Sequence, residues 1–155
     1  MFWVIRFIFF WLIFMLFADK RRWRELFTVS IFSVAVGATT DNLMHHYHLW
    51  IYDNLQTSII ADLTDDWSVY TVSTYLFIQW LPKNRNFRNM IIYWFIYTTI
   101  TIIIEFIHIY SGHMLYPTWW NIGLSYLCDW ILLFIFYKFH QIFKLEKLSN
   151  KYPTI

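Results

Sequence analysis

Five apolar runs separated by short polar stretches organise the chain, at about residues 2–18, 26–45, 67–81, 90–110 and 119–139. A helix of 17 residues rises about 26 Å, close to the ~30 Å of a bilayer's hydrocarbon core. Pro82 ends the third run, because proline breaks a helix. The pattern therefore predicts an all-α fold: a polytopic membrane helix bundle with five transmembrane helices. Four would remain if the first run lay only in the membrane interface.

The basic residues give these predicted helices an orientation. Apart from Arg6, they form three groups, at residues 20–24, 83–88 and 138–151. Alternation of five spans puts all three groups on one side, as expected for cytoplasmic flanks. The N-terminus is then outside, and a tail over residues 141–155 is cytoplasmic. Residues 46–66 form the outer loop, in which Leu55, Ile59 and Leu63 have the spacing of an interfacial helix.

Composition agrees with this reading. The chain is 59% hydrophobic and 14% charged, whereas soluble domains are roughly 45–50% apolar and about 25% charged. A single cysteine, Cys128, excludes a disulfide scaffold. The basic groups are short and flank the spans, so we expect no nucleic-acid partner. The expected location is the cell membrane, as a single domain over residues 1–155, with the lipid bilayer as partner. A homo-oligomer or a membrane-protein partner remains open.

Polar residues recur within the spans at intervals of three or four, so they share one helix face. Stripes that met lipid would be costly, and we expect them to face one another inside the bundle. The stripes are Ser30, Ser33, Gly37, Asp41 and His45 in the second run, Thr98, Thr101, Glu105 and His108 in the fourth, and Asn121, Ser125 and Asp129 in the fifth.

Depth brings the ionisable members of these stripes together. Asp41 and Glu105 each lie about fifteen residues from the cytoplasmic end of their run, roughly 22 Å in. His45 and His108 follow one turn further out, and Asp129 falls near the midplane. These five residues are the predicted polar cluster, which we expect to open to the outer face. Its secondary members are Asn121, Ser125, Trp50 and Tyr52.

Three functions fit such a cluster. The first is binding or conduction of a proton, cation or small polar solute, alone or as a subunit of a larger assembly. The second is a membrane-embedded enzyme in which Asp41, His45, Glu105 and His108 hold a metal ion or act as general acid and base. The third is a structural or interaction protein without a ligand. The sequence requires no cofactor, although a single metal ion would suit this set. The chain lacks a phosphate-binding loop and a serine elbow, which favours a protein that is not an enzyme.

Several short motifs lie along the chain: Arg22-Trp23-Arg24-Glu25, Asp41, Trp50-x-Tyr52, Gln79 to Lys83, Glu105, and Trp119 or Trp120 with Tyr126. Together they resemble a family of small uncharacterised polytopic membrane proteins from endospore-forming bacteria. The resemblance covers about Arg21 to His140 and differs between Asp53 and Asp66, where the family's proline is missing. That family has no assigned activity, so the resemblance implies the topology and the choice of Asp41 and Glu105.

Overall fold

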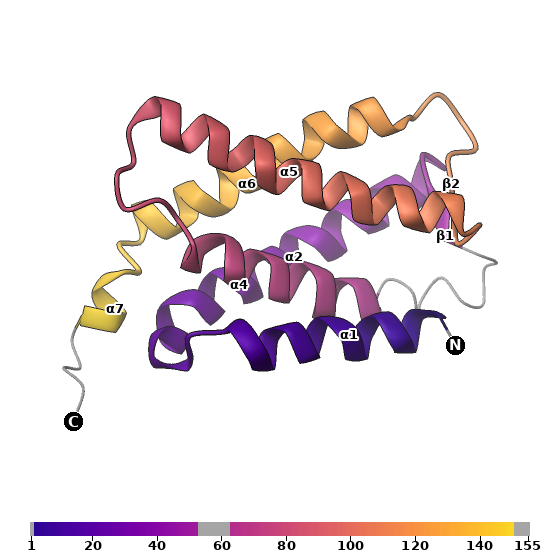
Figure 1. The fold of residues 1–155 in the computed structure, drawn as a ribbon. Helices are drawn as coiled ribbons and strands as arrows, with labels where there is room; N and C mark the ends of the chain where they lie inside the picture. Colours follow the sequence, from indigo (N-terminus) through magenta and orange to yellow (C-terminus); the bar gives the residue numbers. More distant parts are fainter. Residues whose placement is uncertain (1, 53–62, 151–155) are drawn as a thin grey trace.

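The computed structural model describes residues 2–52 and 63–150, and its long helical segments lie side by side (Figure 1). These segments are α1 (Phe2–Phe17), α2 (Trp23–His46), the π-helical η2 (Asp65–Tyr70) continuing into α4 (Thr71–Gln79), α5 (Phe87–Tyr110) and α6 (Ile122–Ile142). The short elements are η1 (Lys20–Arg22), α7 (Lys147–Asn150), and the strands β1 (Ile51–Tyr52) and β2 (Met114–Leu115), which pair antiparallel.

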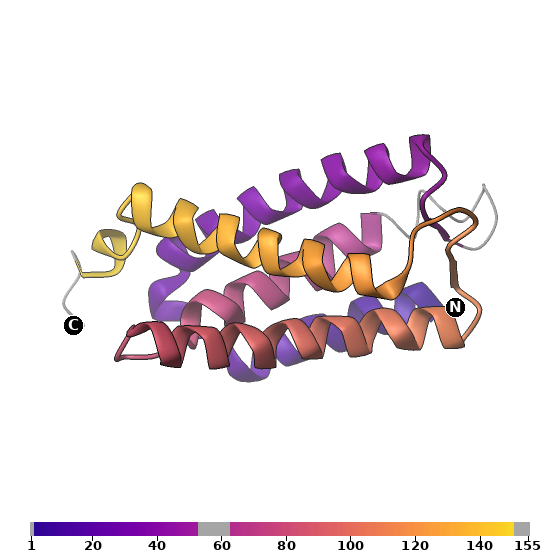
Figure 2. The ribbon, with the colours of Figure 1, turned by 90° about the horizontal axis from the view of Figure 1, so that it is seen from above.

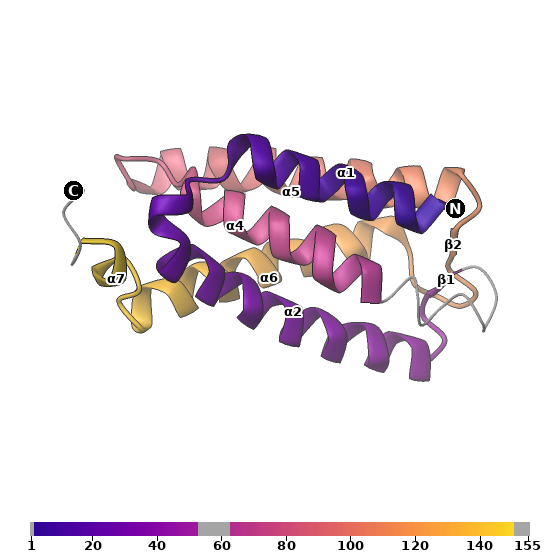
Figure 3. The same ribbon diagram turned by 90° about the horizontal axis from the view of Figure 1, so that it is seen from below.

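Three of these helices are long and apolar enough to cross a membrane. They cover Lys20–His46, Phe87–Tyr110 and Ile122–Ile142. The all-α prediction is therefore confirmed for the described residues. The segments that match the first and third predicted spans are shorter, with 16 residues in α1 and 6 and 9 residues in η2 and α4. Both run alongside the longer helices (Figures 2 and 3). The helix predicted around Leu55 and Ile59 lies outside the described residues.

Helix α4 forms the centre of the bundle. Seven of its nine residues are buried, including Tyr75 and Phe77, and α1, α2 and α6 all pack against η2 or α4. Its polar Thr71 and Thr74 are buried as well. By contrast, α1 and α5 expose large apolar side chains on their outer faces, as helices in contact with lipid do. A short helix can thus occupy the middle of the bundle because its neighbours surround it.

Consecutive long segments run in opposite directions, which separates two ends of the molecule (Figure 1). The basic groups at residues 20–24, 83–88 and 138–147 gather at one end, which we call the basic end. The paired strands and the N-terminus lie at the other, which we call the strand end. The arrangement matches the alternation expected from the sequence.

The buried carboxylate of Glu25 connects several segments at the basic end. Glu25 is 1% exposed, and Arg22 donates to it at 2.6 Å. His140 in α6 lies 2.8 Å from the same oxygen, Oε1, and Ser149 in α7 donates to Oε2 at 2.5 Å. Glu25 therefore joins the start of α2 to the last two helices.

Candidate functional site

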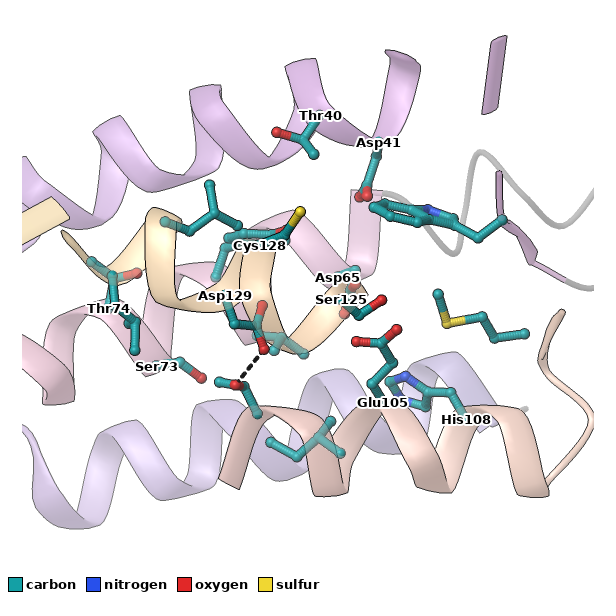
Figure 4. A pocket seen from close by; sticks show the side chains of 18 of the residues that line it. Thr40, Asp41, Asp65, Ser73, Thr74, Glu105, His108, Ser125, Cys128 and Asp129 are labelled. Carbon is teal, nitrogen blue, oxygen red and sulfur yellow. Dashed lines mark hydrogen bonds between the residues drawn. The ribbon is translucent and has the colours of Figure 1, made fainter. Parts of the chain in front are cut away.

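A cavity of about 130 Å³ lies between α2, η2–α4, α5 and α6 (Figure 4). Four acidic side chains line it: Asp41 from α2, Asp65 from η2, Glu105 from α5 and Asp129 from α6. His108 lies beside Glu105. The structure thus brings together four of the five residues of the predicted cluster, Asp41, Glu105, His108 and Asp129, and adds Asp65. We call this space the acidic cavity.

Helical spacing places the α5 residues there. Thr101, Glu105 and His108 follow one another at intervals of four and three, so they share the face of α5 that turns toward the cavity. The Thr101 hydroxyl donates to Asp129 Oδ2 at 2.6 Å, which joins α5 to α6 (Figure 4). Asp129 is held in place by this bond.

The π-helical turn determines how Asp65 enters the cavity. The backbone N–H of Thr71 donates to the carbonyl of Asp66, five residues earlier, which is the pattern of a π-helix. With this wider turn Asp65 and Tyr70, five residues apart, both line the cavity. The sequence reading assigned Asp65 to the outer loop, and the structure corrects this, because Asp65 and Asp66 are buried within the helical segment that continues into α4.

An ion pair between α1 and η2 adjoins the cavity. Arg6 is 7% exposed, and its Nη2 lies 2.8 Å from Asp65 Oδ1. Its Nη1 lies 2.8 Å from His108 Nε2. Sequence reasoning missed this contact. Two features of the sequence could have indicated it: a lone arginine inside the first apolar run, and a pair of acidic residues directly before the third apolar run.

The secondary residues divide into two groups. Ser125 lines the cavity and accepts from the indole N–H of Trp120 at 2.9 Å, and Tyr116 hydrogen bonds to Glu105 and contacts Ser125. Asn121 instead caps α6, since its side chain accepts from the N–H groups of Gly123 and Leu124 at 3.0 and 3.2 Å. Trp50 and Tyr52 line the cavity as expected.

The structure does not assemble the predicted metal set. His45 is not among the residues that line the cavity, and its ring packs edge-on against Tyr52, with 5.6 Å between ring centroids. Within residues 2–52 and 63–150, no group of three or more His, Cys, Asp or Glu residues is positioned to hold a metal ion. Asp41, Glu105 and His108 line the same cavity but do not form a metal-binding group of three either.

Aromatic residues cover the cavity at the strand end. Trp50, Tyr52 and Met114 line the cavity and also belong to a buried apolar cluster with Trp3, Leu49 and Trp120. These residues of the cavity wall are therefore part of a buried apolar cluster. Burial raises the pKa of the Tyr52 phenol well above its ordinary value, and the nearby Asp41 and Asp65 raise it further. The phenol remains a proton donor, and it donates to Asp65 Oδ2 at 3.3 Å.

No protein family, curated protein or solved structure matches the chain. Function therefore has to follow from the cavity itself. Its walls combine carboxylate oxygens with the aromatic rings of Trp50, Tyr52 and Tyr70. Carboxylates attract cations, and aromatic faces bind organic cations through the ring quadrupole.

Proposed function

We propose that the protein spans the cell membrane five times and binds a small cation or a cationic polar solute in the acidic cavity. The observation that carries this proposal is the convergence of four carboxylates, from four helical segments, on one cavity in an otherwise apolar bundle. Ionisable groups inside membrane bundles are costly, so a cluster of them is a functional site by default.

The charge balance favours a cation over an anion. Asp65 is paired with Arg6, and the carboxylates of Asp41, Glu105 and Asp129 also line the cavity. None of the described residues that line it is Lys or Arg. The volume of about 130 Å³ is large enough for several waters, or for a small cation with part of its hydration shell.

The membrane topology rests on length, charge and packing together. At ~1.5 Å per residue, the 16 residues of α1 reach about 24 Å, which a locally thinned bilayer accommodates. The buried contact of Arg6 with Asp65 supports α1 as a member of the bundle rather than a surface helix. The basic end is cytoplasmic under the positive-inside rule, so the N-terminus is outside and the C-terminus inside.

Cation binding by the purified protein in lipid nanodiscs tests the proposal. The probes are radiolabelled Na⁺, methylammonium and tetramethylammonium. We expect at least one to bind, and we expect Glu105→Gln and Asp129→Asn each to weaken its binding at least tenfold, because each removes a negative charge from the cavity wall. The double variant should bind only slightly less tightly than the single variant with the lower affinity, since both groups hold the same ion.

The matched control is Glu146→Gln, an exposed carboxylate that lies 3.7 Å from Arg85 and outside the cavity. It should bind like the wild type. Absence of binding of all three probes, or equal binding by the wild type and the cavity variants, would contradict the proposal.

A further inference from the structure

A second and larger cavity, of about 610 Å³, lies along α1, α4 and α5. Its walls are almost entirely apolar, and several of the residues that line it, among them Phe9, Ile100 and Ile107, are about half exposed. In a membrane this space faces the hydrocarbon chains of the bilayer. Arg6 and His108 are its polar members at the strand end. We call it the lateral groove.

The lateral groove and the acidic cavity share a wall. Ser73, Thr101, Ile104 and His108 line both spaces. On the acidic side of this wall the hydroxyl of Thr101 already contacts Asp129, at 2.6 Å. One layer of side chains therefore separates an apolar, lipid-facing space from the carboxylates.

Two contacts bracket this wall along the bundle. Toward the basic end, the Tyr97 hydroxyl donates to the carbonyl of Ser73 at 2.9 Å and holds α5 to α4. Toward the strand end, Arg6 bonds to His108 at 2.8 Å and holds α1 to α5. Between these levels, α5 presents Thr101 and Ile104. These two side chains line both spaces, and Thr101 is bonded to Asp129.

We infer that the two spaces take one ligand, a cationic amphiphile whose ammonium head lies in the acidic cavity and whose hydrocarbon chain lies in the lateral groove. The inference rests on the proposed function, which it deepens by naming the ligand class. The ammonium head is assigned to the acidic cavity because their charges are opposite. The hydrocarbon chain is assigned to the lateral groove because the walls of the groove are apolar. The wall that both spaces share is the route that the inference assigns to the ligand, because it lies between the lipid-facing groove and the carboxylates.

Photolabelling in nanodiscs tests the inference. The probe is dodecyltrimethylammonium with a photoreactive diazirine at the end of its chain, and labelled residues are mapped by mass spectrometry. We expect labels on the α1, α4 and α5 residues of the lateral groove, and we expect excess tetramethylammonium to reduce them at least fivefold by occupying the acidic cavity. A dodecanol probe with the same diazirine reports ordinary lipid contact and should not be displaced.

Two tryptophan variants supply the matched comparison. Ile100→Trp fills the lateral groove and should reduce labelling by the long-chain probe severalfold while tetramethylammonium binding is kept. Ile103→Trp adds the same volume to an exposed position of α5 outside both spaces and should label like the wild type. The probe partitions into the bilayer equally in the two samples, so partition does not affect the comparison of labelling between the two variants.

The outcomes separate the two proposals. Two results would contradict the inferred amphiphile and leave small-cation binding intact. One is that tetramethylammonium binds but leaves labelling of the groove unchanged. The other is that the Ile100→Trp variant is labelled as strongly as the Ile103→Trp variant. If none of Na⁺, methylammonium and tetramethylammonium binds to the wild type, the proposed function fails and the inference fails with it.

Discussion

Arg6 lies within an apolar helix, and its guanidinium contacts Asp65 and His108, each at 2.8 Å. A buried charge is tolerated when it is paired and hydrogen bonded. The three side chains come from α1, η2 and α5, so this contact holds the first helix against the segments that form the acidic cavity. It also neutralises one of the four carboxylates.

Replacing Arg6 by Met should lower the free energy of unfolding by about 3–5 kcal/mol, because Asp65 then stays buried without its cation. Thermal unfolding of the purified protein in detergent measures the effect. The double variant Arg6→Met with Asp65→Asn should recover most of the loss, since it removes the unpaired charge. Equal destabilisation of the single and double variants would show that the charge pair is not the cause.

Local spacing identified the cavity residues on α2, α5 and α6, because Asp41, Glu105 and Asp129 belong to polar stripes that can be read within one helix. The pairing of Arg6 with Asp65 could not be read in this way. This ion pair joins two segments far apart in the sequence. Neither Arg6 nor Asp65 belongs to a polar stripe at helical spacing, so no local pattern indicates that they are partners. His45 has the right spacing, but its ring packs against Tyr52, a contact set by tertiary structure.

At the scale of elements, α2 approaches η2 closely at Gly37. A Cβ on Gly37 would lie 2.8 Å from Asp66 Oδ1 and 3.0 Å from the Tyr70 ring. Ser33, one turn earlier, donates to the carbonyl of Tyr70 at 3.2 Å. Ser33, Gly37 and Asp41 are all buried, so the prediction that this stripe faces other helices is confirmed.

Gly37→Ala tests this packing by the sign of its effect. Helix propensity alone would stabilise the variant by about 1 kcal/mol. We expect destabilisation of about 1–3 kcal/mol instead, because both neighbours are packed and must shift. Ala38→Leu, on the exposed side of the same helix, should unfold at nearly the wild-type temperature. A higher melting temperature for Gly37→Ala would mean that α2 and η2 are not in close contact.

For the third helix, the sequence pattern predicts one end correctly and the other end incorrectly. The sequence places its start at Trp67, since charged residues are usually excluded from spans. In the structure, residues 63 and 64 are already helical, and the π-turn that follows them contains Asp65, which pairs with Arg6 and accepts a hydrogen bond from Tyr52. The end near Pro82 was predictable, as α4 stops at Gln79. The partners that allow Asp65 to be buried in this segment are distant in the sequence, so its burial has no local signal.

At the scale of the whole molecule, the positions of the basic groups at one end predict which sites an impermeant reagent reaches. In a Cys128→Ser background, a cysteine replacing Tyr110, which is 87% exposed near the strand end, should react in intact cells. A cysteine replacing the exposed Asn84 at the basic end should react only after permeabilisation. The reverse pattern would invert the proposed orientation.

The contacts of Glu25 also set an order of events during synthesis. Arg22 is present beside it from the start, but His140 and Ser149 follow 115 and 124 residues later. At ~5–20 residues per second, the ribosome supplies His140 roughly 6–23 s after Glu25. Until then the carboxylate lacks two of its three partners. Closure of the basic end is therefore a late step of biogenesis, and a nascent chain arrested before residue 140 carries an incompletely paired acid.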